Sequence, residues 1–126
     1  MEAWKKYLVE SWGLNASFAD RIALFINWLN YYGLHPSIKS GFRDPEHQKK
    51  LRAEYDAGKR AGFNARPAID SLHTVTNWSR PDARAIDIGT TNNETASRIA
   101  RALRIGTGLD FKDPDPGHYF DLGSRA

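Results

Sequence analysis

Residues 71–89, SLHTVTNWSRPDARAIDIG, run from a polar loop into a short apolar segment that is typical of a β-strand. His73 lies in the polar part, and Asp87 lies between two isoleucines in the apolar part. Alternation along a strand places Ala85 and Asp87 on one face and the isoleucines on the other. An unpaired carboxylate is costly to bury among apolar residues, so Asp87 requires a partner, and a metal ion is one of the strongest.

A second histidine with a nearby acid occurs close to the end of the sequence, in DPDPGHYFDL at residues 113–122. His73, Asp87 and His118 together supply two imidazoles and one carboxylate, a set that leaves the fourth position of a tetrahedral zinc open for water. Asp115, three residues before His118, is then available as a general base for that water. The set is typical of a catalytic zinc site rather than of a closed structural one.

Two other interpretations of these residues remain open. Without a metal, His73 is a loop residue, Asp87 pairs with an arginine and His118 is a strand histidine with its own hydrogen-bond partner. A serine hydrolase would use Ser71 and His73, although the chain contains no G-x-S-x-G sequence. The absence of HExxH excludes a zinc site carried on one helix. The two remaining histidines are interpreted as loop or surface residues: His35 and His47.

The composition is that of a folded globular protein. The 126 residues are 40% hydrophobic and include six Phe, five Tyr and four Trp, which predicts a single domain over residues 1–126. The absence of cysteine excludes disulfides and Cys-ligated zinc. The formal charge of +3 arises from basic and acidic residues mixed along the chain. The sequence therefore lacks the clustered basic residues that would indicate nucleic-acid binding. The sequence contains no run of about 18 apolar residues, so it predicts no membrane span.

Periodicity and turn residues predict an α+β fold, in which three to four helices flank a small, mainly antiparallel sheet. A loop as long as residues 59–82 in a compact domain is usually functional. The predicted elements are helices at 2–12 and 17–33, a strand at 36–43, a helix at 44–57, a strand at 83–89, a helix at 92–106, and a hairpin with strands at 109–111 and 118–122.

Two of the predicted helices carry apolar residues for the core. In the second helix, Ser17 is the expected N-cap and Gly33 the expected end. The core residues expected from the two helices are Trp4, Tyr7, Leu8 and Trp12 in the first, and Phe18, Ile22, Phe25, Ile26 and Leu29 in the second.

Three segments of the sequence, in the correct order, resemble the zinc D-alanyl-D-alanine carboxypeptidases and L-alanyl-D-glutamate endolysins, the LAS-type metallopeptidases. Residues 40–48, SGFRDPEHQ, resemble the family's SGYRS segment with its following P-E and Q. Residues 71–73, SLH, followed by residues 85–88, AIDI, are similar to the motif S-x-H-x-x-G-x-A-x-D. Residues 115–120, DPGHYF, are similar to the ending acid-x-x-H-aromatic. The similarity covers roughly residues 36–123.

The resemblance implies a LAS/hedgehog-like peptidase fold with a catalytic Zn²⁺. It implies His73, Asp87 and His118 as the zinc ligands and Asp115 as the general base or acid. These roles coincide with the ligand set that the residue types themselves suggest.

The resemblance also implies residues that act on the substrate. Arg43 would polarise the scissile carbonyl and stabilise its oxyanion, a role that suits a guanidinium. Ser71 and Gln48 would line the substrate cleft. The substrates of this family are stem peptides of the bacterial cell wall, in which D-amino acids exclude ordinary proteases.

The spacing of the first two ligands departs from the family. Asp87 lies 14 positions after His73, twice the family's usual separation, and the family's glycine falls at Ala83. An insertion over roughly Thr74 to Arg80 must therefore bulge out between the ligands, which costs little because loops lengthen cheaply. We expect it to form a lip over the cleft, with Trp78 either packing it down, the favoured role, or stacking against the substrate.

The expected function is an endolysin-type L-alanyl-D-glutamate endopeptidase in phage lysis, since the sequence before His73 is more like that branch. A D-Ala-D-Ala carboxypeptidase or dipeptidase is the alternative within the class. A catalytically silent phage structural or binding module with the same fold is the alternative outside it. The N-terminus lacks a signal peptide, so we expect synthesis in the cytoplasm of a host and action on the cell wall after release. A monomer is expected, with a cell-wall peptide as partner, no nucleic acid and no membrane insertion.

Overall fold

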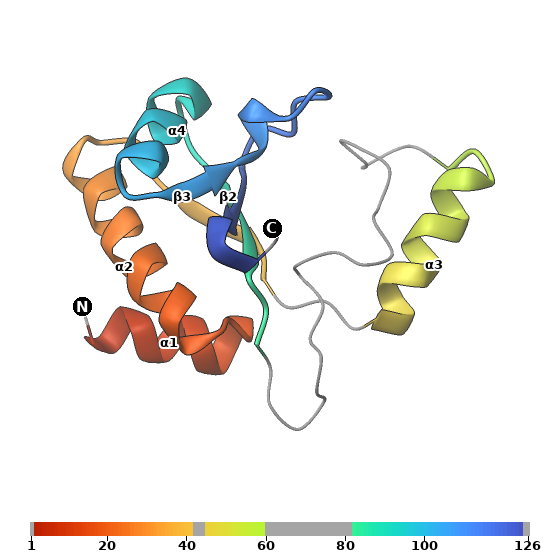
Figure 1. Ribbon diagram of the computed structural model, residues 1–126, viewed down its shortest axis with the longest axis horizontal. Coiled ribbons are helices and arrows are strands. Elements are labelled where there is room, and N and C mark those ends of the chain that lie inside the picture. The colour runs from red at the N-terminus through yellow and green to blue at the C-terminus, as the bar shows by residue number, and fades with distance from the viewer. Residues whose placement is uncertain (1, 42–44, 60–81, 125–126) are drawn as a thin grey trace.

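The computed structural model describes residues 2–41, 45–59 and 82–124, which form helices and one sheet (Figure 1). The predicted α+β class with a small antiparallel sheet is confirmed. In chain order the elements are α1 (Glu2–Trp12), α2 (Ala16–Tyr31), β1 (Ser37–Ser40), α3 (Pro45–Asp56), β2 (Ala85–Gly89), α4 (Asn93–Ala102), β3 (Ile105–Thr107), the 3-10 turn η1 (Gly108–Asp110), β4 (His118–Asp121) and the 3-10 turn η2 (Leu122–Ser124).

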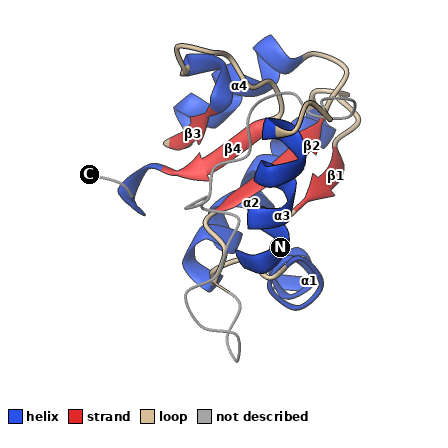
Figure 2. Ribbon diagram, turned by 90° about the vertical axis from the view of Figure 1, so that its right-hand side faces the viewer, coloured by secondary structure: helices blue, strands red, loops and turns tan. Residues whose placement is uncertain are grey.

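The described strands form one antiparallel sheet in the order β1-β2-β4-β3, which Figure 2 shows side by side. The central pair is β2 and β4, in which residues 85–87 run against residues 118–120. The edge strand β1 pairs with β2, and a bulge between Ile38 and Ser40 sets Ser40 opposite Asp87. The sheet therefore brings together segments that are far apart in the sequence.

The hydrophobic core fills the space between the sheet and the helices α1, α2 and α4. The apolar stripe predicted for the second helix is confirmed, because all of its members are at most 2% exposed. Burial of each such side chain contributes about 1.5–3 kcal/mol. The ring of Phe25 meets that of Tyr119 edge to face, with ring centroids 4.7 Å apart. The stripe consists of Phe18, Ile22, Phe25, Ile26 and Leu29.

The helix α3 lies on the side of the sheet opposite α1 and α2 (Figure 1). It begins at Pro45, whose fixed φ suits the first helical position. It ends at Asp56, and Gly58 follows with φ +97°. Both ends agree with the predicted helix at 44–57.

The N-cap of α2 differs from the prediction. The side chain of Asn15, rather than Ser17, accepts a hydrogen bond from the backbone N–H of Phe18 at 3.1 Å. Both residue types are good N-caps, so the choice depends on tertiary contacts. The backbone N–H of Asn15 donates to the carbonyl of Ala83 at 2.9 Å, which fixes the extended conformation at residue 15.

The end of the fourth helix and the position of the third strand also differ from the prediction. The helix α4 ends at Ala102, residues 105–107 form β3, and residues 108–110 form a 3-10 turn where a strand was predicted. The chain reverses at Arg104, which has φ +59° without being glycine. The carbonyl of Arg104 accepts a hydrogen bond from Arg21 Nη1 at 3.0 Å, a contact with α2 that supports this conformation.

The prediction that α1 buries four large residues is wrong for two of them. Leu8 is buried and Trp12 packs at the border of the core. Trp4 and Tyr7 are 38% and 44% exposed, and their rings contact each other on the surface. The helix therefore packs along the side that carries Leu8 and Trp12.

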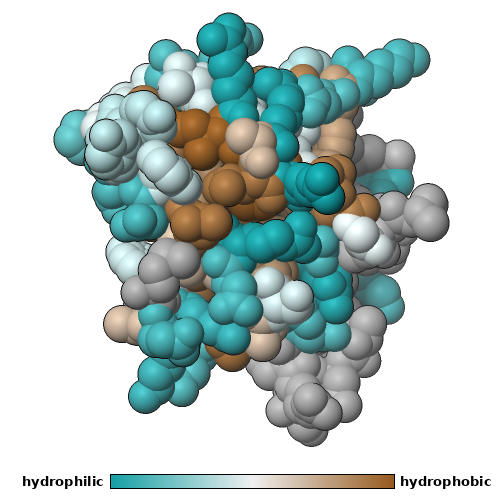
Figure 3. Space-filling view, turned by 60° about the vertical axis from the view of Figure 1, so that its left-hand side comes forward, coloured by the Kyte–Doolittle hydropathy of each residue, from teal (hydrophilic) through white to brown (hydrophobic). Residues whose placement is uncertain are grey.

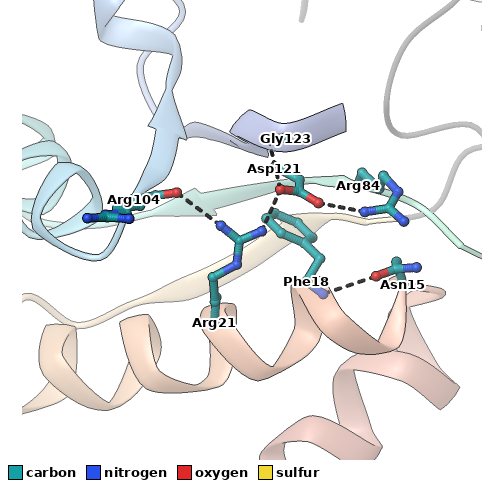
Figure 4. Close-up of polar contacts among 7 residues, drawn as sticks. All are labelled: Asn15, Phe18, Arg21, Arg84, Arg104, Asp121 and Gly123. Carbon is teal, nitrogen blue, oxygen red and sulfur yellow. Dashed lines mark hydrogen bonds and ion pairs between the residues drawn. The ribbon is translucent and has the colours of Figure 1, made fainter. Parts of the chain in front are cut away.

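A carboxylate on the helix-covered face of the sheet joins four parts of the chain (Figure 4). Asp121 of β4 is 5% exposed and receives Arg21 of α2 at 2.5 Å and Arg84, just before β2, at 2.6 Å. The backbone N–H of Gly123 also donates to it at 3.2 Å. Burial raises the pKa of the Asp121 carboxyl, but the hydrogen bonds from Arg21, Gly123 and Arg84 outweigh this, and the net pKa is lowered.

Figure 3 shows one outer side of the molecule, where hydrophobic surface gathers in one area and hydrophilic residues surround it. Among the described residues, no helix combines the length and the apolar character needed to cross a membrane.

Candidate metal centre

The two faces of the sheet have different characters. On β2, Ile86 and Ile88 are fully buried against the helices, as is Tyr119 on β4. Alternation along the strands therefore directs Asp87 and His118 to the other face. The sequence of β2 predicts this placement of Asp87 on the face opposite the two isoleucines. In β4, His118 lies in the same way on the face opposite the buried Tyr119.

Asp87 and His118 are directly paired across the two central strands. Asp87 Oδ1 lies 3.0 Å from His118 Nδ1. The side chains are 25% and 15% exposed, so both remain accessible to a ligand. An ionised carboxylate only accepts hydrogen bonds, so with Asp87 ionised the histidine nitrogen would be the donor in this contact.

The donor set fits a cation in place of that proton. Two ligands at zinc-binding distance in a tetrahedral site lie about 3.4 Å apart, close to the 3.0 Å between Asp87 Oδ1 and His118 Nδ1. Carboxylate oxygen and imidazole nitrogen are both preferred zinc donors. The same distance is also that of a hydrogen bond between the two groups, so the geometry suits a metal or a proton.

A tight turn holds Asp115 next to His118. The carbonyl of Asp115 accepts a hydrogen bond from the backbone N–H of His118 at 3.3 Å, and Gly117 has φ +85°. Proline followed by a glycine of positive φ is the signature of a type II turn. The carbonyl of Gly117 also accepts from the N–H of Ile88 at 2.8 Å, which docks the turn on β2.

Gly108 permits the close approach of this turn to η1. A Cβ at position 108 would lie 2.2 Å from the carbonyl oxygen of Asp115 and 3.0 Å from Cβ of His118. The backbone N–H of Asp115 donates to the carbonyl of Gly108 at 2.9 Å. Any larger residue at position 108 would displace the turn that carries Asp115.

An aromatic shelf, defined here as Phe111 and Phe120, borders His118. The ring centroids of Phe111 and His118 are 5.8 Å apart, and those of Phe111 and Phe120 are 5.4 Å apart. His118 and Phe120 stack at 5.8 Å. Phe120 occupies space that a side chain at Gly106 would fill, since a Cβ there would lie 2.4 Å from its ring. The shelf was not foreseen, although the G-T-G spacing at residues 106–108 hints at close approach.

The structure describes three of the residues predicted for the site, and it brings Asp87 and His118 into contact, with Asp115 at the adjacent turn. Ser40, from the first motif, lies opposite Asp87. His35 is exposed after α2, with φ +50°. Among the side chains that the structure describes, no third His, Cys, Asp or Glu joins the pair. The remaining predictions lie outside the described residues or side chains: Arg43, His47, Gln48, Ser71, His73, and the Thr74 to Arg80 insertion with Trp78.

Comparison of the chain with models of protein families and with curated proteins found no match.

Proposed function

We propose that this protein is a zinc-dependent peptidase that hydrolyses amide bonds in the stem peptides of bacterial peptidoglycan. The supporting observation is the 3.0 Å contact between Asp87 and His118 on the accessible face of the sheet. The residue types, their order in the chain and the adjacent Asp115 agree with the motifs of the zinc peptidases described above. The bond between L-alanine and D-glutamate is the proposed target, and the bond between two D-alanines is the alternative.

Asp87 and His118 would hold the zinc together with His73. When bound, zinc would act as a Lewis acid toward water and toward the scissile carbonyl. The sheet contributes preorganisation, because Asp87 and His118 are fixed by strand pairing rather than by a loop. The stacking of His118 on Phe120 further restricts the orientation of the imidazole ring.

Asp115 would carry the proton in this reaction. Its carboxylate would take a proton from the attacking water and deliver it to the leaving amine, as a general base and then a general acid. Two hydrogen bonds fix the backbone from which this carboxylate projects: the Asp115 N–H donates to the Gly108 carbonyl, and the His118 N–H donates to the Asp115 carbonyl. Arg43 would stabilise the negative charge that develops on the carbonyl oxygen.

The test combines metal analysis with hydrolysis of defined peptides. Purified protein supplied with zinc should retain one equivalent after dialysis and should cleave a synthetic L-alanyl-D-glutamyl stem peptide, as followed by mass spectrometry. His118→Ala should lose both properties, and Asp115→Asn should lose hydrolysis while keeping zinc.

Asp110→Asn is the matched control, because Asp110 is an exposed acid that pairs with Arg101 outside the site. It should behave as the wild type. Zinc retention without cleavage of any stem peptide would favour a catalytically silent binding module. Failure to retain zinc would contradict the metal site and the enzyme together.

A further inference from the structure

The positively charged side chain of Lys39 lies on the same sheet face as Asp87 and His118. The stem of Lys39 crosses Gly89: its Cε lies 3.0 Å, and its Nζ 3.9 Å, from where a Cβ on Gly89 would be. Gly89 follows Asp87 by two residues, so both are directed to one face. A side chain at position 89 would displace the end of Lys39, so the glycine leaves room for the lysine stem to lie across the sheet.

Within the described part of the chain, no carboxylate pairs with Lys39, although five other basic residues form ion pairs with acidic residues. An exposed lysine is usually fully solvated. Lys39 is exposed, but its stem lies against the sheet at Gly89, beside the candidate site.

The opposite flank of the site is apolar. Phe120 pairs with Ala85, two residues from Asp87 in the direction away from Gly89. Phe111, which is 41% exposed, covers Phe120 and His118. Two residues along a strand span about 7 Å, so Asp87 lies midway between the cationic flank and the aromatic shelf. A carboxylate is favoured near Lys39 and disfavoured near the phenylalanines.

The geometry points to Lys39 as the residue that binds the substrate carboxylate next to the scissile amide, with the shelf receiving the small apolar residue on the other side. This inference rests on the proposed peptidase function and adds the orientation of the substrate. The residue on the amine side of the bond carries a free carboxylate both in a D-glutamyl peptide and in a peptide that ends in D-alanine. One or two residues of extended peptide, at about 3.4 Å each, match the spacing from Asp87 to Gly89.

The test uses pairs of peptides that differ only in this carboxylate. One peptide of each pair has the free carboxylate, and the other has a carboxamide of the same shape. Hydrolysis by the zinc-loaded full-length protein gives kcat and KM for wild type, Lys39→Gln, Lys39→Arg and the control Lys6→Gln, which changes an exposed lysine on α1. Binding of non-cleavable analogues, with a methyleneamine in place of the scissile amide, is measured by calorimetry in parallel.

Lys39→Gln should raise KM for the carboxylate peptide about fivefold, as expected for an exposed ion pair, and should leave kcat and the carboxamide peptide unchanged. Lys39→Arg should keep most of the preference because it keeps the charge. In the wild type, the preference should shrink as salt is added. Lys6→Gln should have no effect.

The outcomes separate this inference from the proposed function. Hydrolysis with equal KM for the two peptides in wild type and Lys39→Gln would overturn the role of Lys39 and leave the peptidase intact. Absence of hydrolysis, with a Lys39-dependent preference for the carboxylate analogue in calorimetry, would reject the peptidase and retain the carboxylate site. Absence of both hydrolysis and preference would overturn both.

Discussion

Asp87 and Asp121 lie on neighbouring strands of one sheet but face opposite sides of it. Asp121 is almost fully buried beside two arginines, which satisfy both of its carboxylate oxygens. Asp87 is one quarter exposed and contacts an imidazole, a group that binds metals. One sheet thus directs Asp121 to buried ion pairs on its helix-covered face and Asp87 to a partly exposed contact with His118 on the other face.

The largest expected difference between the two aspartates is in zinc binding and hydrolysis. Asp87→Asn should abolish zinc retention and lower kcat/KM by at least about 1,000-fold, which corresponds to ~4 kcal/mol. Asp121→Asn should keep kcat/KM within about threefold in protein that remains folded, because it lies on the other face. Peptide hydrolysis and metal analysis measure both variants. Equal losses in the two would remove the distinction between the faces.

The second difference should appear in stability, in the reverse order. Asp121→Asn should lower the free energy of unfolding by about 2 kcal/mol, because Arg21 and Arg84 lose their counter-charge at a largely buried position. Asp87→Asn should change it by less than about 1 kcal/mol in metal-free protein. Urea unfolding, followed by tryptophan fluorescence, gives both values. A larger loss in Asp87→Asn would mean that the His118 contact is structural.

The third difference concerns pH. The pKa of Asp121 is lower in the folded protein than the usual value of about 3.9 in an unfolded chain. Its stabilising contribution is therefore complete above that unfolded value and is lost as pH falls below it, through the folded pKa. Wild type should lose more stability between pH 5 and pH 2 than Asp121→Asn does. Parallel curves for the two proteins would show that Asp121 does not carry this acid sensitivity.

The smallest effect is expected at a third aspartate, which serves as the reference. Asp110 forms an exposed pair with Arg101 at 2.7 Å, and its hydrogen bond with Arg101 lowers the pKa of Asp110. Water and salt screen such a pair. Asp110→Asn should leave the urea midpoint unchanged within error, and a clear shift would show that surface pairs matter more here than usual.

The parts of the fold that follow a local periodic pattern could be predicted from the sequence. The α2 stripe and the two faces of β2 repeat at the spacing of a helix and of a strand, so each residue's side is fixed by its neighbours. The chain reversal at Arg104, after the end of α4, could not be predicted, because a left-handed residue other than glycine has no local signal. The short β3 could not be predicted either, since its three residues depend on pairing with β4.

The candidate site could be predicted only in its residue types. The cost of burying a carboxylate identified Asp87, and the acid at position 115 drew attention to His118. Their contact depends on the pairing of Asp87 with His118, which requires the register between strands 31 positions apart. The positions of Lys39 and of the aromatic shelf depend on space left by Gly89 and Gly106, which arises only from the packing of the folded chain.

The close packing of Gly41 against Trp12 has a consequence for protein engineering. A Cβ at position 41 would lie 2.4 Å from the carbonyl oxygen of Trp12, so the end of β1 rests directly on the last turn of α1. The chain passes from there toward Arg43 within two residues. Deleting the first helix to shorten the protein would therefore remove the backbone against which Gly41 packs, and fusion partners are better joined ahead of Glu2 than in place of α1.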